Sequence, residues 1–73
     1  MLFRYLPIKE SFHSDEFGDY ISYGIVVLNS FGITITTVSD VSLNESFVSE
    51  LCQECNINQL DPIHLLEVIE DRL

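Results

Sequence analysis

The chain has 73 residues, a net charge of −9 and 47% hydrophobic residues. A chain of this length buries only about 60% of the surface that its unfolded form exposes, so we expect one small domain of modest stability over the whole chain. The hydrophobic content is too high for a disordered acidic tail, and the negative charge disfavours direct binding to nucleic acid or to anionic membranes. A basic protein is the natural partner of such a surface.

The N-terminal stretch and the two cysteines predict a cytoplasmic protein. The stretch Met1–Pro7 lacks the basic start and long apolar run of a secretory signal, and no stretch approaches the length of a membrane-spanning helix. Cys52 and Cys55 lie close together in a helical pattern, which is typical of reduced thiols rather than of a secreted disulfide scaffold.

The N-terminal half predicts three strands. Residues 2–8 form the first, and Pro7 suits an edge strand because it lacks a backbone donor. Residues 20–28 form the strongest strand, being aromatic and β-branched almost throughout, and residues 33–38 alternate cleanly as the third. Residues 9–19 mix charges with Ser, Asp and Gly and predict a connecting loop.

The turn at residues 29–32 sets which side chains share a face of the sheet. The apolar sets of the two flanking strands face the same way only if Val27 lies opposite Ile33, which a turn ending in a left-handed Gly32 with a bulge would supply. The first face then carries the larger apolar residues, Ile21, Tyr23, Ile25, Val27, Ile33 and Ile35. The opposite face carries Tyr20, Val26 and Leu28 together with Ser22, Thr34 and Thr36.

A first helix is predicted after Ser42. Ser42 and Glu45 have the spacing of a capping box, in which each side chain satisfies a backbone donor of the first turn. The apolar positions then form a broad stripe that ends near Asn56, consisting of Leu43, Phe47, Val48, Leu51, Cys52 and Cys55.

A second helix is predicted from residue 61 onward. Asp61 can accept a hydrogen bond from a first-turn N–H, and Pro62 suits the first helical position. Its apolar face consists of Ile63, Leu66, Ile69 and Leu73, widened by Leu65 and Val68. The fold class is therefore α+β: a three-stranded antiparallel β-meander covered on one face by a C-terminal αα-hairpin, in the order β-β-β-α-α.

Two motifs invite a chemical interpretation, and neither is favoured. The thiols of Cys52 and Cys55 lie toward a helix C-terminus among carboxylates, which opposes thiolate formation, and His13 and His64 do not give zinc-finger spacing. A buried structural pair is the preferred interpretation, with metal and redox roles as alternatives. His64 lies near Glu67, but the sequence places no nucleophile beside it. We expect no enzyme activity, cofactor or metal.

The helical carboxylates are the strongest candidates for a binding surface. Glu50 and Glu54, and Glu67 with Glu70 and Asp71, are like-charge neighbours at helical spacing, where local stability would favour mixed signs. Such a row can imitate phosphates and occupy a basic groove, which predicts a regulator or inhibitor of a nucleic-acid-binding protein. A solvated acidic face is the simpler alternative.

The outward side chains of the sheet are a second candidate surface. Tyr20, Val26 and Leu28 form a set too apolar to leave in water, so a partner or a second copy would cover them in a structural homodimer. Alternatively, the loop of residues 9–19, with Phe12 and Phe17, wraps across that face.

Four stretches of the sequence, residues 20–25, 38–42, 51–56 and 60–71, carry a resemblance to a known family. The most specific is Leu60-Asp61-Pro62-Ile63-His64-Leu65. Together they resemble a family of short bacterial proteins of unknown function that end in a helix with this Leu-Asp-Pro-Ile-His-Leu motif. The resemblance covers most of residues 20–72 and implies a bacterial cytoplasmic protein with this order of elements, but no activity.

Overall fold

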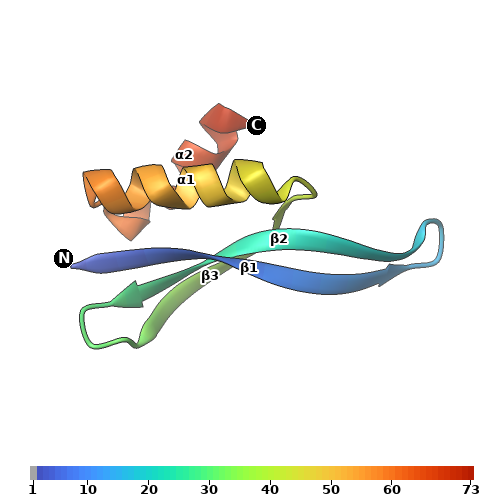
Figure 1. Cartoon of the computed structure of the whole chain (residues 1–73), viewed down its shortest axis with the longest axis horizontal. Coiled ribbons are helices and arrows are strands. Elements are labelled where there is room, and N and C mark those ends of the chain that lie inside the picture. The colour runs from blue at the N-terminus through green and yellow to red at the C-terminus, as the bar shows by residue number, and fades with distance from the viewer. Residues whose placement is uncertain (1) are drawn as a thin grey trace.

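The computed structural model describes residues 2–73 and has the predicted order of elements. Its strands are β1 (Phe3–Ser14), β2 (Gly18–Asn29) and β3 (Thr34–Ser42), which form one antiparallel sheet in the order β1-β2-β3. Its helices are α1 (Glu45–Asn58), the 3-10 turn η1 (Pro62–His64) and α2 (Leu65–Arg72). Figure 1 shows both helices on one side of the sheet, with α1 lying along it. The predicted α+β class is confirmed.

The predicted loop of residues 9–19 is wrong, because β1 and β2 continue through it as a long hairpin. Phe12 lies opposite Tyr20, and the two rings stack with centroids 5.4 Å apart. The turn is closed by the Ser14 hydroxyl, which accepts the backbone N–H of Glu16 and of Phe17, and by Gly18 at φ +73°. Phe17 is 80% exposed, so it does not tuck under the sheet.

The β2–β3 turn is confirmed, but the predicted register is wrong. Gly32 has the expected left-handed φ of +78°, and the Asn29 side chain accepts two backbone N–H groups of the turn. A register shift between Val27 and Leu28 then places Val27 opposite Thr36 rather than Ile33. Thr36 therefore lies on the helix side of the sheet, while Ile33 and Ile35 are exposed.

The core lies between the sheet and the two helices. The sheet contributes three buried side chains to it, those of Tyr5, Ile25 and Val27. Tyr5 and Val27 lie on the same face because they are cross-strand partners. The helices supply the remaining buried side chains, which are Val48, Leu51, Cys52 and Cys55 from α1 and Leu65 and Ile69 from α2. Ile21, predicted to belong to this face, is 40% exposed; in Figure 1 its end of the hairpin extends beyond α1.

The start of α1 differs from the predicted capping box. Asn44 is the N-cap, and its side chain accepts the backbone N–H of Phe47. Ser42 is instead the last residue of β3, opposite Tyr23, and its hydroxyl accepts the N–H of Asn44. Strand pairing therefore holds Ser42 out of the helix, and Leu43 is left 68% exposed outside the apolar stripe.

The start of the second helix is confirmed, but the predicted apolar face is wrong at three positions. Asp61 caps Ile63 N–H as expected, yet the first turn is 3-10, so Ile63 does not continue the α-helical spacing of the residues in α2. Leu65 and Ile69 are buried, whereas Ile63, Leu66 and Leu73 are 78%, 61% and 75% exposed.

Side-chain amides from α1 close the outer edge of β1. Asn56 pairs with Tyr5 as a neighbouring strand would: its Oδ1 accepts Tyr5 N–H at 2.7 Å and its Nδ2 donates to Tyr5 C=O at 2.9 Å. Gln59, in the left-handed conformation after α1, accepts the N–H of Leu2 and of Phe3 and donates to Phe3 C=O. Since Pro7 has no N–H to offer, this edge is closed from residue 2 to residue 7.

Candidate functional site

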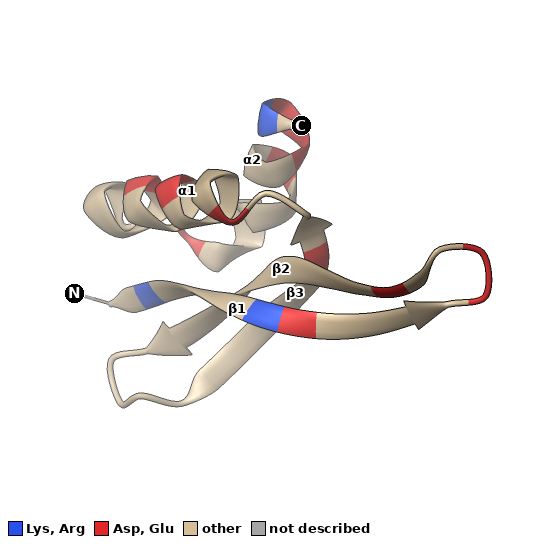
Figure 2. Ribbon diagram, turned by 45° about the vertical axis from the view of Figure 1, so that its right-hand side comes forward, with Lys and Arg blue, Asp and Glu red and all other residues tan. Residues whose placement is uncertain are grey.

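The predicted acidic residues on the helices are mostly exposed. Glu50, Glu67, Glu70 and Asp71 are exposed to solvent. Figure 2 shows Asp and Glu along both helices and again at the tip of the β1–β2 hairpin, while Lys and Arg lie in β1 and at the end of α2. The helical carboxylates are therefore spread over α1 and α2 on the helix side of the sheet, and a second acidic group lies at the tip of the hairpin.

One predicted partner-binding carboxylate is neutralised by the chain itself. Arg72 Nη1 lies 2.6 Å from Glu54 Oε2, and both side chains are about half exposed. This pair joins α1 to the last turn of α2, so Glu54 serves the packing of the two helices rather than a free acidic row. His64 Nδ1 lies 3.7 Å from Glu67 Oε2 on the exposed surface of η1 and α2.

The outer face of the sheet is the face opposite α1. It holds the apolar residues predicted there, but in two separate groups. Val26 and Leu28 lie opposite Leu6 and Arg4, while Tyr20 lies opposite Phe12 farther along the hairpin. All of these except the exposed Arg4 are half-buried. Because residues 9–19 form the end of β1, a tight turn and the start of β2, they do not wrap across this face as the alternative required.

A polar cluster separates these two apolar groups. The Glu10 carboxylate accepts Ser39 Oγ at 2.7 Å and Asp40 N–H at 3.0 Å, so it reaches from β1 across β2 to β3. This is why residue 24 is glycine: a Cβ there would lie 2.7 Å from Glu10 Oε1 and 2.5 Å from Val38 O. Ser22, predicted to face outward, is fully buried and its hydroxyl donates to Asp40 Oδ1.

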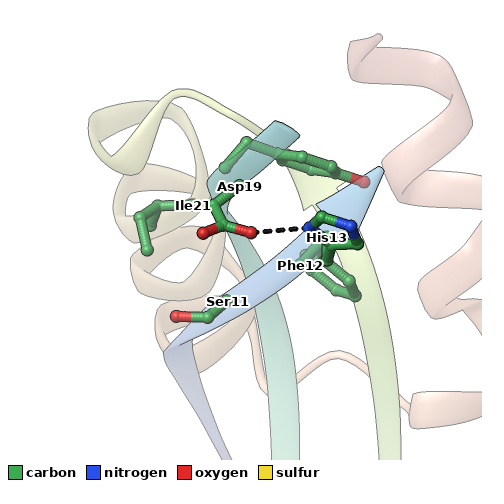
Figure 3. Close-up of a pocket in the computed structure, with 6 residues that line it drawn as sticks. Ser11, Phe12, His13, Asp19 and Ile21 are labelled. Atoms are coloured by element: carbon green, nitrogen blue, oxygen red, sulfur yellow. Dashed lines mark hydrogen bonds and ion pairs between the residues drawn. The ribbon is translucent and has the colours of Figure 1, made fainter. Parts of the chain in front are cut away.

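The hairpin beyond the helices carries two hollows that sequence reasoning missed because it predicted a loop. One, of about 400 Å³, is lined by residues 11–13 and 19–21. Figure 3 shows His13 and Asp19 pointing toward one another there, with His13 Nδ1 2.7 Å from Asp19 Oδ1. The other, which we call the tip groove, has a volume of about 610 Å³ and is lined by Ser14, Phe17, Tyr20, Asp40 and Leu43.

Both cysteines are buried and reduced. Burial raises the pKa of the Cys52 thiol from 9.0 to about 12, and the neighbouring Cys55 adds to the shift. Burial and Glu54 also raise the pKa of Cys55, against a smaller opposing effect of Arg72. The predicted burial of the pair is confirmed. Residues 2–73 contain no group of three or more side chains placed to hold a metal ion.

The raised thiol pKa values predict that the folded protein loses stability at high pH. Because the folded-state pKa of Cys52 lies above the unfolded value of 9.0, the unfolded chain holds fewer protons than the folded chain between pH 9 and about 12. Stability is thus fully present below pH 9 and falls as the pH rises above it. We expect the urea midpoint to fall from pH 8 to 10.5, and to fall less in Cys52→Ala. An equally steep decline in that variant would contradict the assignment.

These features define the chain as a small α+β domain with an acidic helical side and an open sheet face. It belongs to DUF6514, a family of unknown function whose model matches residues 1–73. The match includes the first 19 residues, which the sequence resemblance did not cover. Searches of curated proteins and of solved structures found no match. Among the described residues, no helix is long and apolar enough to cross a membrane.

Proposed function

We propose that this protein is a non-enzymatic acidic module that docks its helices on a basic protein surface, as a small regulator or inhibitor of a nucleic-acid-binding protein in the bacterial cytoplasm. The observation that carries the proposal is the exposure of Glu50, Glu67, Glu70 and Asp71 on two helices that share one core and are joined by the Arg72–Glu54 ion pair. Carboxylates on such a support are held in a fixed arrangement, which favours recognition of a fixed set of cations.

The distribution of charged residues in the fold supports the same proposal. The chain has three Lys and Arg residues against twelve Asp and Glu. Arg72 is engaged by Glu54, and Arg4 lies on the outer face of the sheet, away from the helices. Lys9 is exposed on β1 and makes no ion pair with a described carboxylate. The helical carboxylates are therefore left with a net negative field, which steers a basic partner toward them and weakens as salt is added.

Neutralising the exposed carboxylates is expected to weaken binding of a basic partner. The binding partner for this test is a lysine- and arginine-rich protein captured from native lysate. We expect Glu50→Gln combined with Glu70→Gln to reduce its affinity by about tenfold at low salt, because two charges are lost from the interface. Isothermal titration at two salt concentrations measures this. Affinity that is unchanged by both salt and the substitutions would refute the proposal.

The hairpin tip offers a matched control. Asp15→Asn combined with Glu16→Gln removes the same formal charge from exposed positions far from the helices. If net charge alone drives association, the two double variants weaken binding equally. If the helices form the docking surface, the tip variant weakens binding of this partner less than the helical variant does.

The open sheet face favours a homodimer as a second candidate function. Val26 and Leu28 are half-buried within one copy, and no element among residues 2–73 covers them. Face-to-face pairing would leave the acidic helices on opposite outer sides, so their charges would not oppose it. Sedimentation analysis at high micromolar concentration decides the matter: a dimer that Val26→Lys converts to a monomer supports this function, and a monomeric parent protein removes it.

A further inference from the structure

We propose that the tip groove binds an extended, basic segment of another protein, which adds as a short strand along β2 beyond the end of β3. This surface is separate from the helical carboxylates, so the inference does not rest on the proposed function. It combines an open strand edge, an apolar hollow and a local negative charge.

The open edge follows from the different lengths of the strands. β3 ends at Ser42, opposite Tyr23, whereas β2 begins at Gly18 and pairs with β1 all the way to its start. Residues 18–22 of β2 thus have a strand on one side only within the described chain. Figure 1 shows this part of the hairpin extending past both the end of β3 and the start of α1. Unpaired backbone groups of such an edge are a ready template for an added strand.

The other edges of the sheet are less suited to strand addition. Asn56 and Gln59 occupy the outer edge of β1 near its start, and Pro7 follows them. The outer edge of β3 is interrupted by two register shifts along its pairing with β2 and by Asp40 at φ +55°. Irregularities of this kind twist an edge away from regular pairing. Residues 8–14 of β1 also lack an outer neighbour within the described chain, but the tip groove adjoins the open part of β2, where Asp40 and Leu43 approach from the end of β3.

The tip groove supplies a place for side chains of the added segment. Phe17 and Leu43 are 80% and 68% exposed and approach the groove from the hairpin turn and from the residue after β3. Tyr20, held by its stacking on Phe12, lines it from β2. An added strand would bury one or two apolar side chains here, because alternate residues of a strand point to the same face.

The charge around the groove selects the occupant. Asp40 lines it, and Asp15 and Glu16 are exposed on the adjoining turn. A second copy of this chain would bring the same carboxylates face to face, which disfavours pairing of two tips. A segment that alternates bulky apolar residues with Lys or Arg satisfies both the groove and its charge.

A peptide titration followed by amide NMR tests the inference on the full chain. The probe is a synthetic seven-residue peptide of alternating lysine and valine, and its control replaces the valines with proline, which cannot donate a strand hydrogen bond. We expect peptide-dependent shifts at residues 18–22 and 40–43 and slower hydrogen exchange of β2 amides there. The inference would be overturned if no amide shifts were seen, or if the shifts were confined to residues around the helical carboxylates. Equal amide shifts with the proline peptide would also overturn it.

Two variants separate this site from the helical one. Phe17→Ser combined with Leu43→Ser changes only exposed side chains, so the fold should persist, and we expect it to weaken the lysine–valine peptide at least fivefold. Glu50→Gln combined with Glu70→Gln should leave that affinity within twofold. The reverse pattern would refute the tip groove while supporting docking on the helices.

Discussion

Replacing Leu65 with alanine is expected to destabilise the protein by about 2 to 5 kcal/mol. Leu65 is 1% exposed and joins α2 to the core, so its truncation removes buried methyl groups and leaves a cavity. A domain of this size is stable by roughly 4 to 11 kcal/mol, so the variant should lose a large part of its stability or unfold at ambient temperature. Urea unfolding followed by circular dichroism measures the change.

The neighbouring leucine provides the control. Leu66 is 61% exposed, and Leu66→Ala makes the same chemical change one position along the same helix. We expect it to alter stability by no more than about 0.5 kcal/mol. Similar losses from both variants would mean that α2 is rotated relative to this structure.

Replacing Asn56 with alanine is expected to cost about 2 to 3 kcal/mol, because it leaves both Tyr5 N–H and Tyr5 C=O without their partner. The same change should speed hydrogen exchange of the Tyr5 amide, since its donor then faces water or an empty site. Unfolding curves and amide exchange measure the two effects independently.

Asn58→Ala is the matched control for this prediction. Asn58 lies in the same last turn of α1 but is exposed, so the substitution has the same effect on helix propensity without touching β1. Its stability should change by about 0.5 kcal/mol or less and its Tyr5 exchange should be unchanged. Equal behaviour of the two variants would show that the amide pairing contributes nothing.

The elements of the fold could be predicted from the sequence where local rules act alone. Asp61 before Pro62 marked a helix start, and Gly32 marked a left-handed turn, because each depends on neighbouring residues only. The capping box at Ser42 failed because pairing with Tyr23 keeps that residue in β3. Which of the adjacent Leu65 and Leu66 is buried depends on how α2 is turned toward the core, and a uniform helical pattern that contains both leucines gives no sign of that orientation.

The candidate surfaces were predictable as residue types but not as arrangements. The sequence contains the acidic residues, yet the neutralisation of Glu54 depends on Arg72, which only the packing of α2 brings near. The hairpin of residues 9–19 was missed because both of its faces carry mostly polar residues, which show little apolar alternation. Its stacked Phe12 and Tyr20, eight positions apart, were the one signal that could have indicated it.

The amides that complete the edge of β1 come from residues more than 50 positions later in the chain. Tyr5 is separated from Asn56 by 51 positions, and Leu2 from Gln59 by 57. Contacts so distant in sequence slow folding, because a large loop must close before they form. During synthesis, β1 thus leaves the ribosome before the residues that complete its hydrogen bonds, and the nascent hairpin must remain soluble until α1 has emerged.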